Sequence, residues 1–152
     1  MSFELEFEGF SEKEMQQLTD DMISVTQLAM KYTAQEVWGN VRKEAPTDHG
    51  RLAGSFDRLE QLGSFEYKTS TNVHYALYVH EGTGIYGPNG QPIEIYPTNK
   101  QALYWPGAPH PVKKVTIQGQ RPNPFATRAI ENAEQRVSEF VRRAMREILG
   151  EI

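Results

Sequence analysis

One long apolar stripe constrains the fold of this chain more than any other feature of its sequence. Between Met15 and Ala45, apolar side chains recur at steps of three and four, the period of one face of an α-helix. Ser11 and Glu14 form a capping box that starts a helix, and Pro46 ends it because the residue before a proline disfavours helical backbone angles. We therefore predict a helix over residues 11–45.

This helix would be long for a chain of 152 residues. At about 1.5 Å of rise per residue it spans roughly 50 Å, more than a domain of this size buries, so part of it should protrude or pack on a neighbouring chain. The apolar stripe suits packing against a sheet, and it also suits the seam of a coiled coil. The sequence leaves both arrangements open.

The segments outside this helix predict strands and loops. Residues 1–10 alternate apolar and acidic side chains, which indicates an N-terminal strand or arm. Residues 82–92 and 105–111 are rich in glycine and proline, so we predict two long surface loops there. Residues 75–79 fit either a short helix or a strand. We predict an antiparallel sheet within residues 55–118. Its strands are residues 55–62, 65–71, 93–96, 101–105 and 112–118.

A second helix is predicted at the C-terminal end, over residues 123–149. Asn123 is a good N-cap and Pro124 a good first helical residue, and Gly150 closes the apolar stripe that follows. The predicted fold is thus α+β, with an antiparallel sheet packed against the long N-terminal helix and the C-terminal helix. The length of 152 residues predicts one domain.

The composition excludes several classes of protein and site. The chain has no cysteine, which excludes disulfides, thiolate zinc sites and a cysteine nucleophile. No apolar run approaches the roughly 20 residues that cross a bilayer, and the start of the chain is acidic where a secretory signal is basic. We therefore expect a soluble protein with no membrane partner.

Charge is distributed unevenly along the chain. Residues 1–99 carry 7 Lys and Arg against 15 Asp and Glu, whereas residues 100–146 carry 9 against 3. Such a split would let an acidic face of one subunit meet a basic face of the next, or let the basic part approach phosphates. Solvated helix faces without any partner would give the same counts.

No motif in the sequence points to a reaction or a cofactor. The four histidines lack the spacing of a metal site, and Asp48, His49 and Ser55 lack the arrangement of a hydrolytic triad. Gly82-Thr83-Gly84 is neither a Walker loop nor a dinucleotide fingerprint. We expect no catalytic, cofactor-binding or metal-binding residues and no enzyme activity. An acid–base pair formed by His80 and Glu81 is the weakest alternative.

Three motifs do resemble a known family. In chain order they are Ala45-Pro46 followed by Asp48-x-Gly50-x-Leu52, then Tyr75-Ala76-x-Tyr78-Val79-His80-Glu81-Gly82-Thr83, and Pro124-Phe125-x-x-Arg128-Ala129. Together they resemble the gene-product-ten-like family of long-tailed bacteriophages and prophages, whose members are neck or tail-completion proteins. The resemblance covers nearly the whole chain after Ser11. Many members carry Glu-Phe-Gly-Thr where this chain has His80-Glu81-Gly82-Thr83, which leaves the role of Glu81 open.

The resemblance implies a structural virion protein that is assembled in the host cytoplasm and acts in head–tail joining. It implies a ring of this chain, for which we expect six copies, that contacts connector, head-closure and tail-terminator proteins. DNA would be met only in the channel. The main alternative is a small DNA-contacting module that uses the basic C-terminal helix.

The resemblance also assigns structural roles to particular residues. It places a turn at Asp48, Gly50 and Leu52, a loop base at Tyr75, Tyr78, Gly82 and Thr83, and a helix start at Pro124 and Phe125. Gly50 and Gly82 are expected to need backbone angles that β-branched residues resist. As candidate interface residues, in or beside the two loops and the basic region, we take Glu81, Ile85, Tyr86, Trp105, Arg121 and Arg128.

Overall fold

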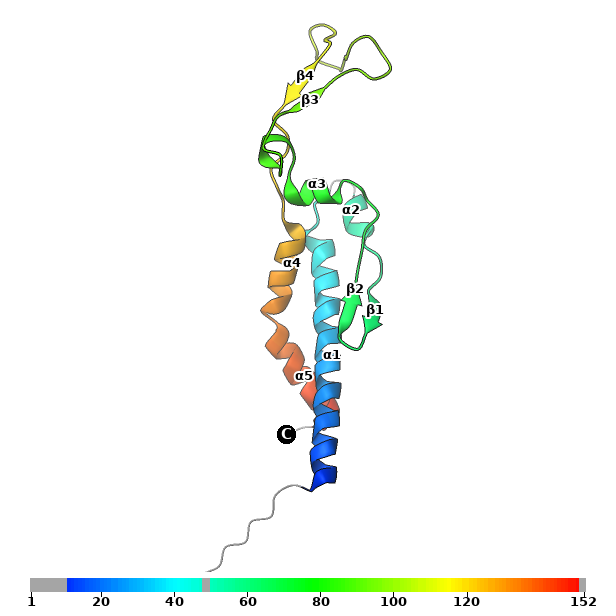
Figure 1. Cartoon of the computed structure of the whole chain (residues 1–152), viewed down its shortest axis with the longest axis vertical. Coiled ribbons are helices and arrows are strands. Elements are labelled where there is room, and N and C mark those ends of the chain that lie inside the picture. The colour runs from blue at the N-terminus through cyan, green and yellow to red at the C-terminus, as the bar shows by residue number, and fades with distance from the viewer. Residues whose placement is uncertain (1–10, 48–49, 151–152) are drawn as a thin grey trace, which may run out of the picture. The chain divides into compact units, whose positions relative to one another are not determined.

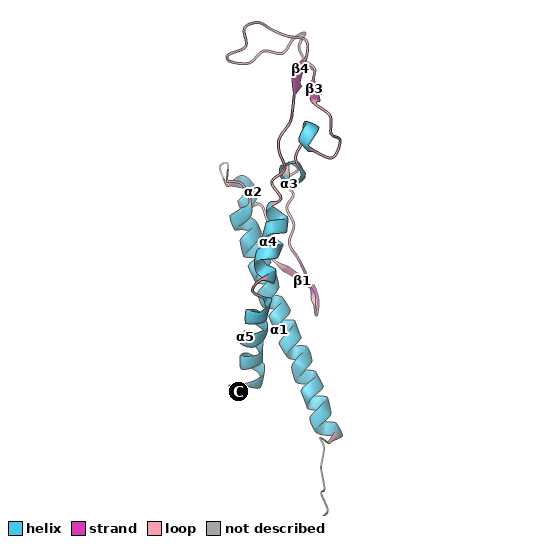
Figure 2. Cartoon of the chain, turned by 90° about the vertical axis from the view of Figure 1, so that its left-hand side faces the viewer, coloured by secondary structure: helices cyan, strands magenta, loops and turns pink. Residues whose placement is uncertain are grey.

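The computed structural model describes residues 11–47 and 50–150 of the chain. The predicted N-terminal strand or arm and Asp48 lie outside the described residues. The α+β class is confirmed, because a long N-terminal helix and C-terminal helices accompany small antiparallel sheets (Figure 1). Figure 2 shows how much of the described chain is helical.

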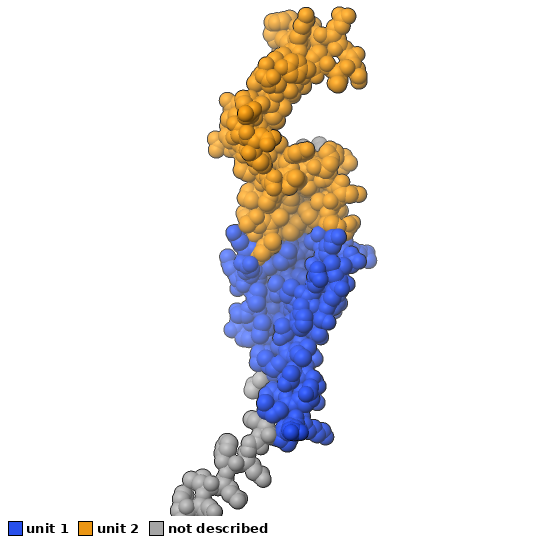
Figure 3. All heavy atoms as spheres, in the orientation of Figure 1, with its two compact units in different colours: residues 1–40, 58–69, 131–152 blue, residues 41–57, 70–130 orange. Residues whose placement is uncertain are grey.

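Contacts between Cα atoms divide the chain into two compact units (Figure 3). The first, which we call the helical unit, consists of residues 1–40, 58–69 and 131–152. The second, which we call the loop unit, consists of residues 41–57 and 70–130. Each unit is described separately below.

The long helix α1 runs from Glu12 to Glu44, close to the predicted bounds. The predicted capping box is present at its start. The backbone N–H of Ser11 donates to a carboxylate oxygen of Glu14 at 2.8 Å, and the N–H of Glu14 donates to the Ser11 hydroxyl at 3.3 Å. These bonds satisfy two amides that the first turn of a helix leaves without partners.

The core of the helical unit joins α1 to helix α5 (Val137–Leu149) through small side chains. Val25 and Ala29 of α1 and Ala144 of α5 are buried there. The residues packed around them are Leu28, Val141, Met145 and Leu149. Alanine at the centre of a contact lets two helix backbones approach closely, so the larger residues lie around this contact rather than in it.

Polar contacts flank this core and tie α5 to α1. The Tyr32 hydroxyl donates to a Glu147 carboxylate oxygen at 2.6 Å, and Arg143 Nε donates to the other oxygen at 2.9 Å. The Arg143 guanidinium also lies 4.1 Å from the centre of the Tyr32 ring. The hydrogen bond from Tyr32 is the main cause that lowers the pKa of Glu147, and the bond from Arg143 lowers it further.

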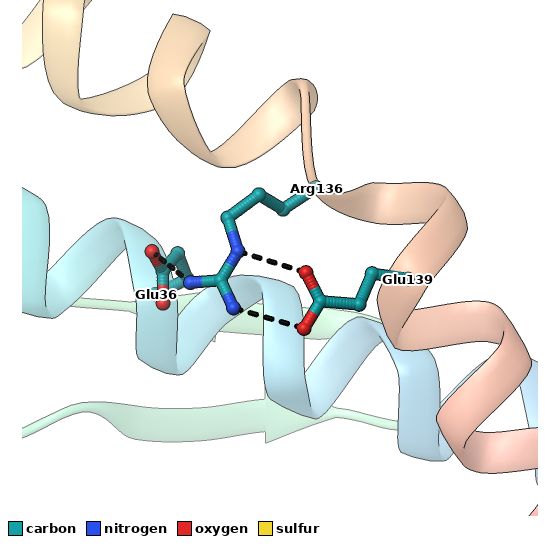
Figure 4. A network of polar contacts seen from close by, with 3 residues as sticks. All are labelled: Glu36, Arg136 and Glu139. Carbon is teal, nitrogen blue, oxygen red and sulfur yellow. Dashed lines mark hydrogen bonds and ion pairs between the residues drawn. The ribbon is translucent and has the colours of Figure 1, made fainter.

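The predicted C-terminal helix is divided in two. Helix α4 runs from Phe125 to Glu134, and α5 follows after a tight turn in which the N–H of Arg136 donates to the carbonyl of Ala133 at 3.0 Å. Arg136 is held at this turn by Glu36 at 2.7 Å and by Glu139 at 3.0 Å (Figure 4). Arg136 thus forms ion pairs with both α1 and α5 at the break between α4 and α5. The apolar stripe is continuous across this break, so the sequence pattern did not predict it.

In the described part of the chain, the strands form two separate two-stranded antiparallel sheets rather than one larger sheet. In the helical unit, β1 (Glu60–Gly63) pairs with β2 (Glu66–Lys68). In the loop unit, β3 (Ile93–Ile95) pairs with β4 (Val115–Ile117).

These strands are shorter than predicted. The predicted strand over residues 101–105 contributes a single bridge, from Leu103 to Val112. The prolines of residues 105–111 interrupt the ladder beyond it, because proline has no backbone N–H to donate.

Three short helical segments complete the loop unit. They are α2 (Arg51–Gly54), α3 (Ala76–Glu81) and a single 3₁₀ turn, η1 (Gly84–Tyr86). Residues 75–79, which fitted either a helix or a strand, therefore contribute to a helix. The η1 turn lies within the first predicted loop.

The polar contacts around Tyr32 predict how stability depends on pH. The pKa of Glu147 is lowered in the folded protein, so its contribution to stability is present above its unfolded pKa and is lost as the pH falls through the folded pKa. We expect Glu147→Gln to lower the free energy of unfolding near neutral pH and to reduce its loss as the pH falls below the ordinary pKa of a glutamate. Urea denaturation from neutral pH downwards measures the effect.

Glu134→Gln is the matched control, because Glu134 is exposed on α4 and forms no ion pair with the described residues. It should keep the acid dependence of the unchanged protein. Equal acid dependence for Glu147→Gln and the unchanged protein would show that the Tyr32–Glu147 contact does not contribute to stability.

Candidate interaction surface

Two segments of the loop unit run against each other just beyond α3, and we call this place the glycine crossing (residues 82–85 and 118–120). The N–H of Thr83 donates to the carbonyl of Gln120 at 2.8 Å, and the N–H of Ile85 donates to that of Gln118 at 2.8 Å. The N–H of Gln120 donates back to the Thr83 hydroxyl at 2.9 Å. These bonds close the base of the segment that carries β3 and β4.

Glycine is required at this crossing for two reasons. Gly84 and Gly119 have φ angles of 65° and 97°, which side chains disfavour. A Cβ on Gly84 would lie 2.1 Å from the Gln118 carbonyl oxygen, and one on Gly119 would lie 2.2 Å from the Thr83 carbonyl oxygen. Both contacts are with backbone atoms, which cannot turn away. The crossing therefore forms only with glycine at these positions.

The crossing continues into a buried anchor at the start of α4. The N–H of Asn123 donates to the carbonyl of Val79 on α3 at 2.9 Å. Phe125 is only 2% exposed, and its ring packs against the rings of Phe56 and His80, with centroids 6.1 Å and 5.6 Å away. The contact between the Phe125 and His80 rings packs the start of α4 against α3.

The β3–β4 hairpin has one apolar face. Its register places Ile93 opposite Ile117 and Ile95 opposite Val115, and alternate residues of a strand point to the same face. An open groove of about 530 Å³ lies on this side. We call its lining the apolar arm face, which consists of Ile95, Leu103, Tyr104, Trp105, Val115 and Ile117.

Much of the apolar arm face is open to solvent. Tyr104 is 68% exposed and Trp105 is 45% exposed, and Ile95 and Ile117 are exposed as well. The opposite face of the hairpin is polar. There Lys114 forms an ion pair with Glu94, and the Tyr96 hydroxyl donates to Glu94 at 2.8 Å. The bond from Lys114 is the main cause that lowers the pKa of Glu94.

This arrangement leaves the hairpin short of stabilising contacts. A two-stranded hairpin is marginally stable on its own in water and gains stability when its apolar face packs on another element. Exposed apolar and aromatic side chains grouped in one patch are typical of a surface that binds another protein.

A second exposed apolar surface lies on the helical unit. It is a groove of 400 Å³ between the first turns of α1 and the β1–β2 hairpin. We call it the α1 groove, and its lining consists of Leu18, Thr19, Met22, Ile23, Thr26 and Phe65. Phe65 is 48% exposed, and Leu18, Met22 and Ile23 are exposed to a similar degree.

Apart from Asp48, which lies outside the described residues, the residues to which the resemblance assigned structural roles lie in the loop unit. Gly50 precedes α2 with a φ of 68°, and Gly82 follows α3 with a φ of 81°, so both have the positive angles expected of them. Leu52 is buried, whereas Tyr78 is exposed on α3 and Tyr75 directly precedes that helix. Thr83 contributes its backbone and hydroxyl to the glycine crossing, and Pro124 and Phe125 lie at the start of α4.

The candidate interface residues divide into four groups. Glu81 is exposed beside the glycine crossing, Ile85 is exposed within it, and Trp105 belongs to the apolar arm face. The Arg121 guanidinium lies 5.0 Å from the centre of the Tyr86 ring. Arg128 differs from the others, because its Nε donates to Glu44 at 2.9 Å and its terminal nitrogen donates to Asn123 at 2.8 Å. Its guanidinium is thus engaged within its own chain.

Most of the apolar arm face was missed in the sequence. The available signal was the alternation of apolar and polar residues in Ile93–Ile95 and Val115–Ile117, which indicates a strand with two unlike faces. That alternation predicted the strands, but it did not show that their apolar faces would be left uncovered.

Among residues 11–47 and 50–150, no three His, Asp or Glu side chains are grouped as metal ligands would be. His80 packs on Phe125 and lies 3.3 Å from the Thr127 hydroxyl, while Glu81 is exposed.

None of the described helices is long and apolar enough to cross a membrane. Comparisons with protein-family models, curated proteins and solved structures gave no match.

The glycine crossing predicts a large effect of a small substitution. Gly84→Ala should lower the free energy of unfolding by more than about 4 kcal/mol or prevent folding, because its Cβ would collide with backbone. Gly90→Ala is the matched control, since Gly90 has a similar φ of 62° but no atom near the added Cβ. It should cost about 1–2 kcal/mol, which is the cost of the backbone angle alone. Chemical denaturation of both variants measures the difference, and equal costs would contradict a tight crossing.

Proposed function

We propose that this chain is a structural virion protein of a long-tailed phage or prophage, which acts in head–tail joining or tail completion as an oligomeric ring. The observation that carries the proposal is the apolar arm face, an exposed aromatic and aliphatic patch on a hairpin of only two strands. The three motifs that resemble neck proteins support the particular role.

The patch suits another protein better than a small molecule. Pockets for small molecules are usually concave and enclose most of their ligand, with a few polar groups that fix its orientation. The apolar arm face is open and lined by apolar and aromatic side chains, among which Tyr104 and Trp105 are the most prominent. Tyrosine and tryptophan are enriched at protein interfaces, where they often supply much of the binding energy.

In the proposed ring, neighbouring copies of this chain are the first partners. We keep six as the expected number of copies, and connector, head-closure and tail-terminator proteins as the neighbours along the particle axis. The isolated chain is monomeric or weakly associated until it meets one of these rings. DNA passes through the channel of the assembled ring.

Deletion of the gene from the phage or prophage that carries it tests this role. We expect the lysate to contain DNA-filled heads and separate tails and few joined particles by electron microscopy, with joining restored by a plasmid copy of the gene. Mass spectrometry should find the chain in purified complete particles. A normal yield of infectious particles without the gene would contradict the proposal.

A DNA-contacting module remains the second candidate, because residues 100–146 carry 9 Lys and Arg against 3 Asp and Glu. The structure engages several of these cations with carboxylates of the same chain. Lys114 pairs with Glu94, Arg128 with Glu44, Arg136 with Glu36 and Glu139, and Arg143 with Glu147. Such pairs reduce the positive charge that is available to phosphates.

We therefore expect weak DNA binding by the isolated protein, which a fluorescence titration with duplex DNA at two salt concentrations measures. A protein that neutralises 6–10 phosphates loses roughly 10³–10⁵-fold in affinity between about 50 and 200 mM salt. Tight binding at low salt with a loss of that size would favour the DNA-contacting module over a purely structural role.

A further inference from the structure

We propose that the apolar arm face of one copy docks in the α1 groove of a second copy of this chain. The inference rests on the proposed function to the extent that the chain assembles with itself. The inference names the two surfaces that meet between copies. These surfaces differ from each other, so the contact is between unlike surfaces.

The two surfaces match in chemistry. The apolar arm face presents Tyr104 and Trp105 together with aliphatic side chains of β3 and β4. The α1 groove presents Leu18, Met22 and Ile23 beside the Phe65 ring. Both are exposed in a single copy, so their contact would remove apolar area from water on both sides. The unbranched methionine side chain adapts readily to an inserted aromatic ring.

The segments that carry the two surfaces have opposite net charges, although Lys114 and Glu94 pair with each other on the far face of the hairpin. Residues 11–30, which carry the groove side of α1, have 4 acidic and 1 basic side chains. Residues 93–121, which carry the apolar arm face, have 4 basic and 1 acidic side chains. Asp20 and Asp21 are held on α1 by hydrogen bonds from Gln16 and Gln17 at 3.0 Å and 2.9 Å. Complementary charge of this kind steers two surfaces together and disfavours the pairing of like surfaces.

This complementarity within one sequence is the reason to choose a second copy as the occupant. Each chain carries one apolar face on a basic segment and one apolar groove on an acidic segment, so every copy offers its arm face to one neighbour and its groove to another. A contact between unlike surfaces generates a closed ring when the rotation between copies closes, and a filament when it does not. The inferred contact is therefore of the type that a ring needs.

Cysteine cross-linking tests the contact directly, because the chain has no cysteine of its own. One preparation carries Thr19→Cys in the α1 groove and a first affinity tag, and the other carries Tyr104→Cys on the apolar arm face and a second tag. The two are mixed under the conditions in which the protein oligomerises and are then oxidised. We expect a disulfide-linked dimer that carries both tags.

The control places the cysteine elsewhere on the same helix, as Gln35→Cys, because Gln35 is exposed on α1 and does not line the groove. This control should yield at least about tenfold less of the dimer with both tags, a ratio that corresponds to about 1.4 kcal/mol. Equal yields from Thr19→Cys and Gln35→Cys would overturn the inference. A chain carrying both Thr19→Cys and Tyr104→Cys that closes only on itself in the assembled state would also overturn it.

Charge substitution in the groove gives an independent readout. Ile23→Glu should weaken self-association at least about tenfold in analytical ultracentrifugation, whereas Gln35→Glu should leave it unchanged. Oligomers that persist in Ile23→Glu without the Thr19–Tyr104 cross-link would overturn the docking of these two surfaces, yet leave the proposed ring intact. Complete particles that lack the chain would overturn the proposed function itself, whatever the cross-links show.

Discussion

The fold depends on small residues at the places where two chain segments approach most closely. At the glycine crossing, Gly84 and Gly119 lie against backbone atoms with no room for a Cβ. In the helical unit, Ala29 and Ala144 occupy the centre of the contact between α1 and α5. Because glycine and alanine occupy these contacts, large apolar side chains do not fill them. The closest contacts are thus formed by the residues that contribute least apolar area to a core.

Many of the large apolar residues lie on the surface, although Leu52, Phe125 and Phe140 are buried. Tyr104 and Trp105 are exposed on the β3–β4 hairpin, and Leu18, Met22 and Phe65 are exposed around the α1 groove. A chain with large apolar patches on its surface buries relatively little apolar area on folding. It gains stability when another chain covers these patches. We therefore regard subunit association as the completion of the fold, and the proposed role in a ring follows from that view.

The sequence predicted those features that are set by local physics. The capping box of Ser11 and Glu14, the end of α1 near Pro46 and the positive φ angles of Gly50 and Gly82 all follow from the preferences of one or a few residues. The division of the sheet in two and the break between α4 and α5 did not follow, because they depend on contacts between distant residues, such as Arg136 with Glu36. Trp105 was predicted as an interface residue. The strand residues around it were not, because they share a face with Trp105 only through a pairing register that cannot be read from the sequence.

Hydrogen–deuterium exchange at several protein concentrations tests most directly whether association completes the fold. The amides of Ile93–Ile95 and Val115–Ile117 report on the hairpin, and those of Thr83 and Ile85 report on the glycine crossing. If other copies cover the apolar arm face, exchange in the hairpin slows as the protein assembles, while exchange at the crossing stays nearly constant. Hairpin exchange that is the same in the monomer and in the assembled protein would contradict this account.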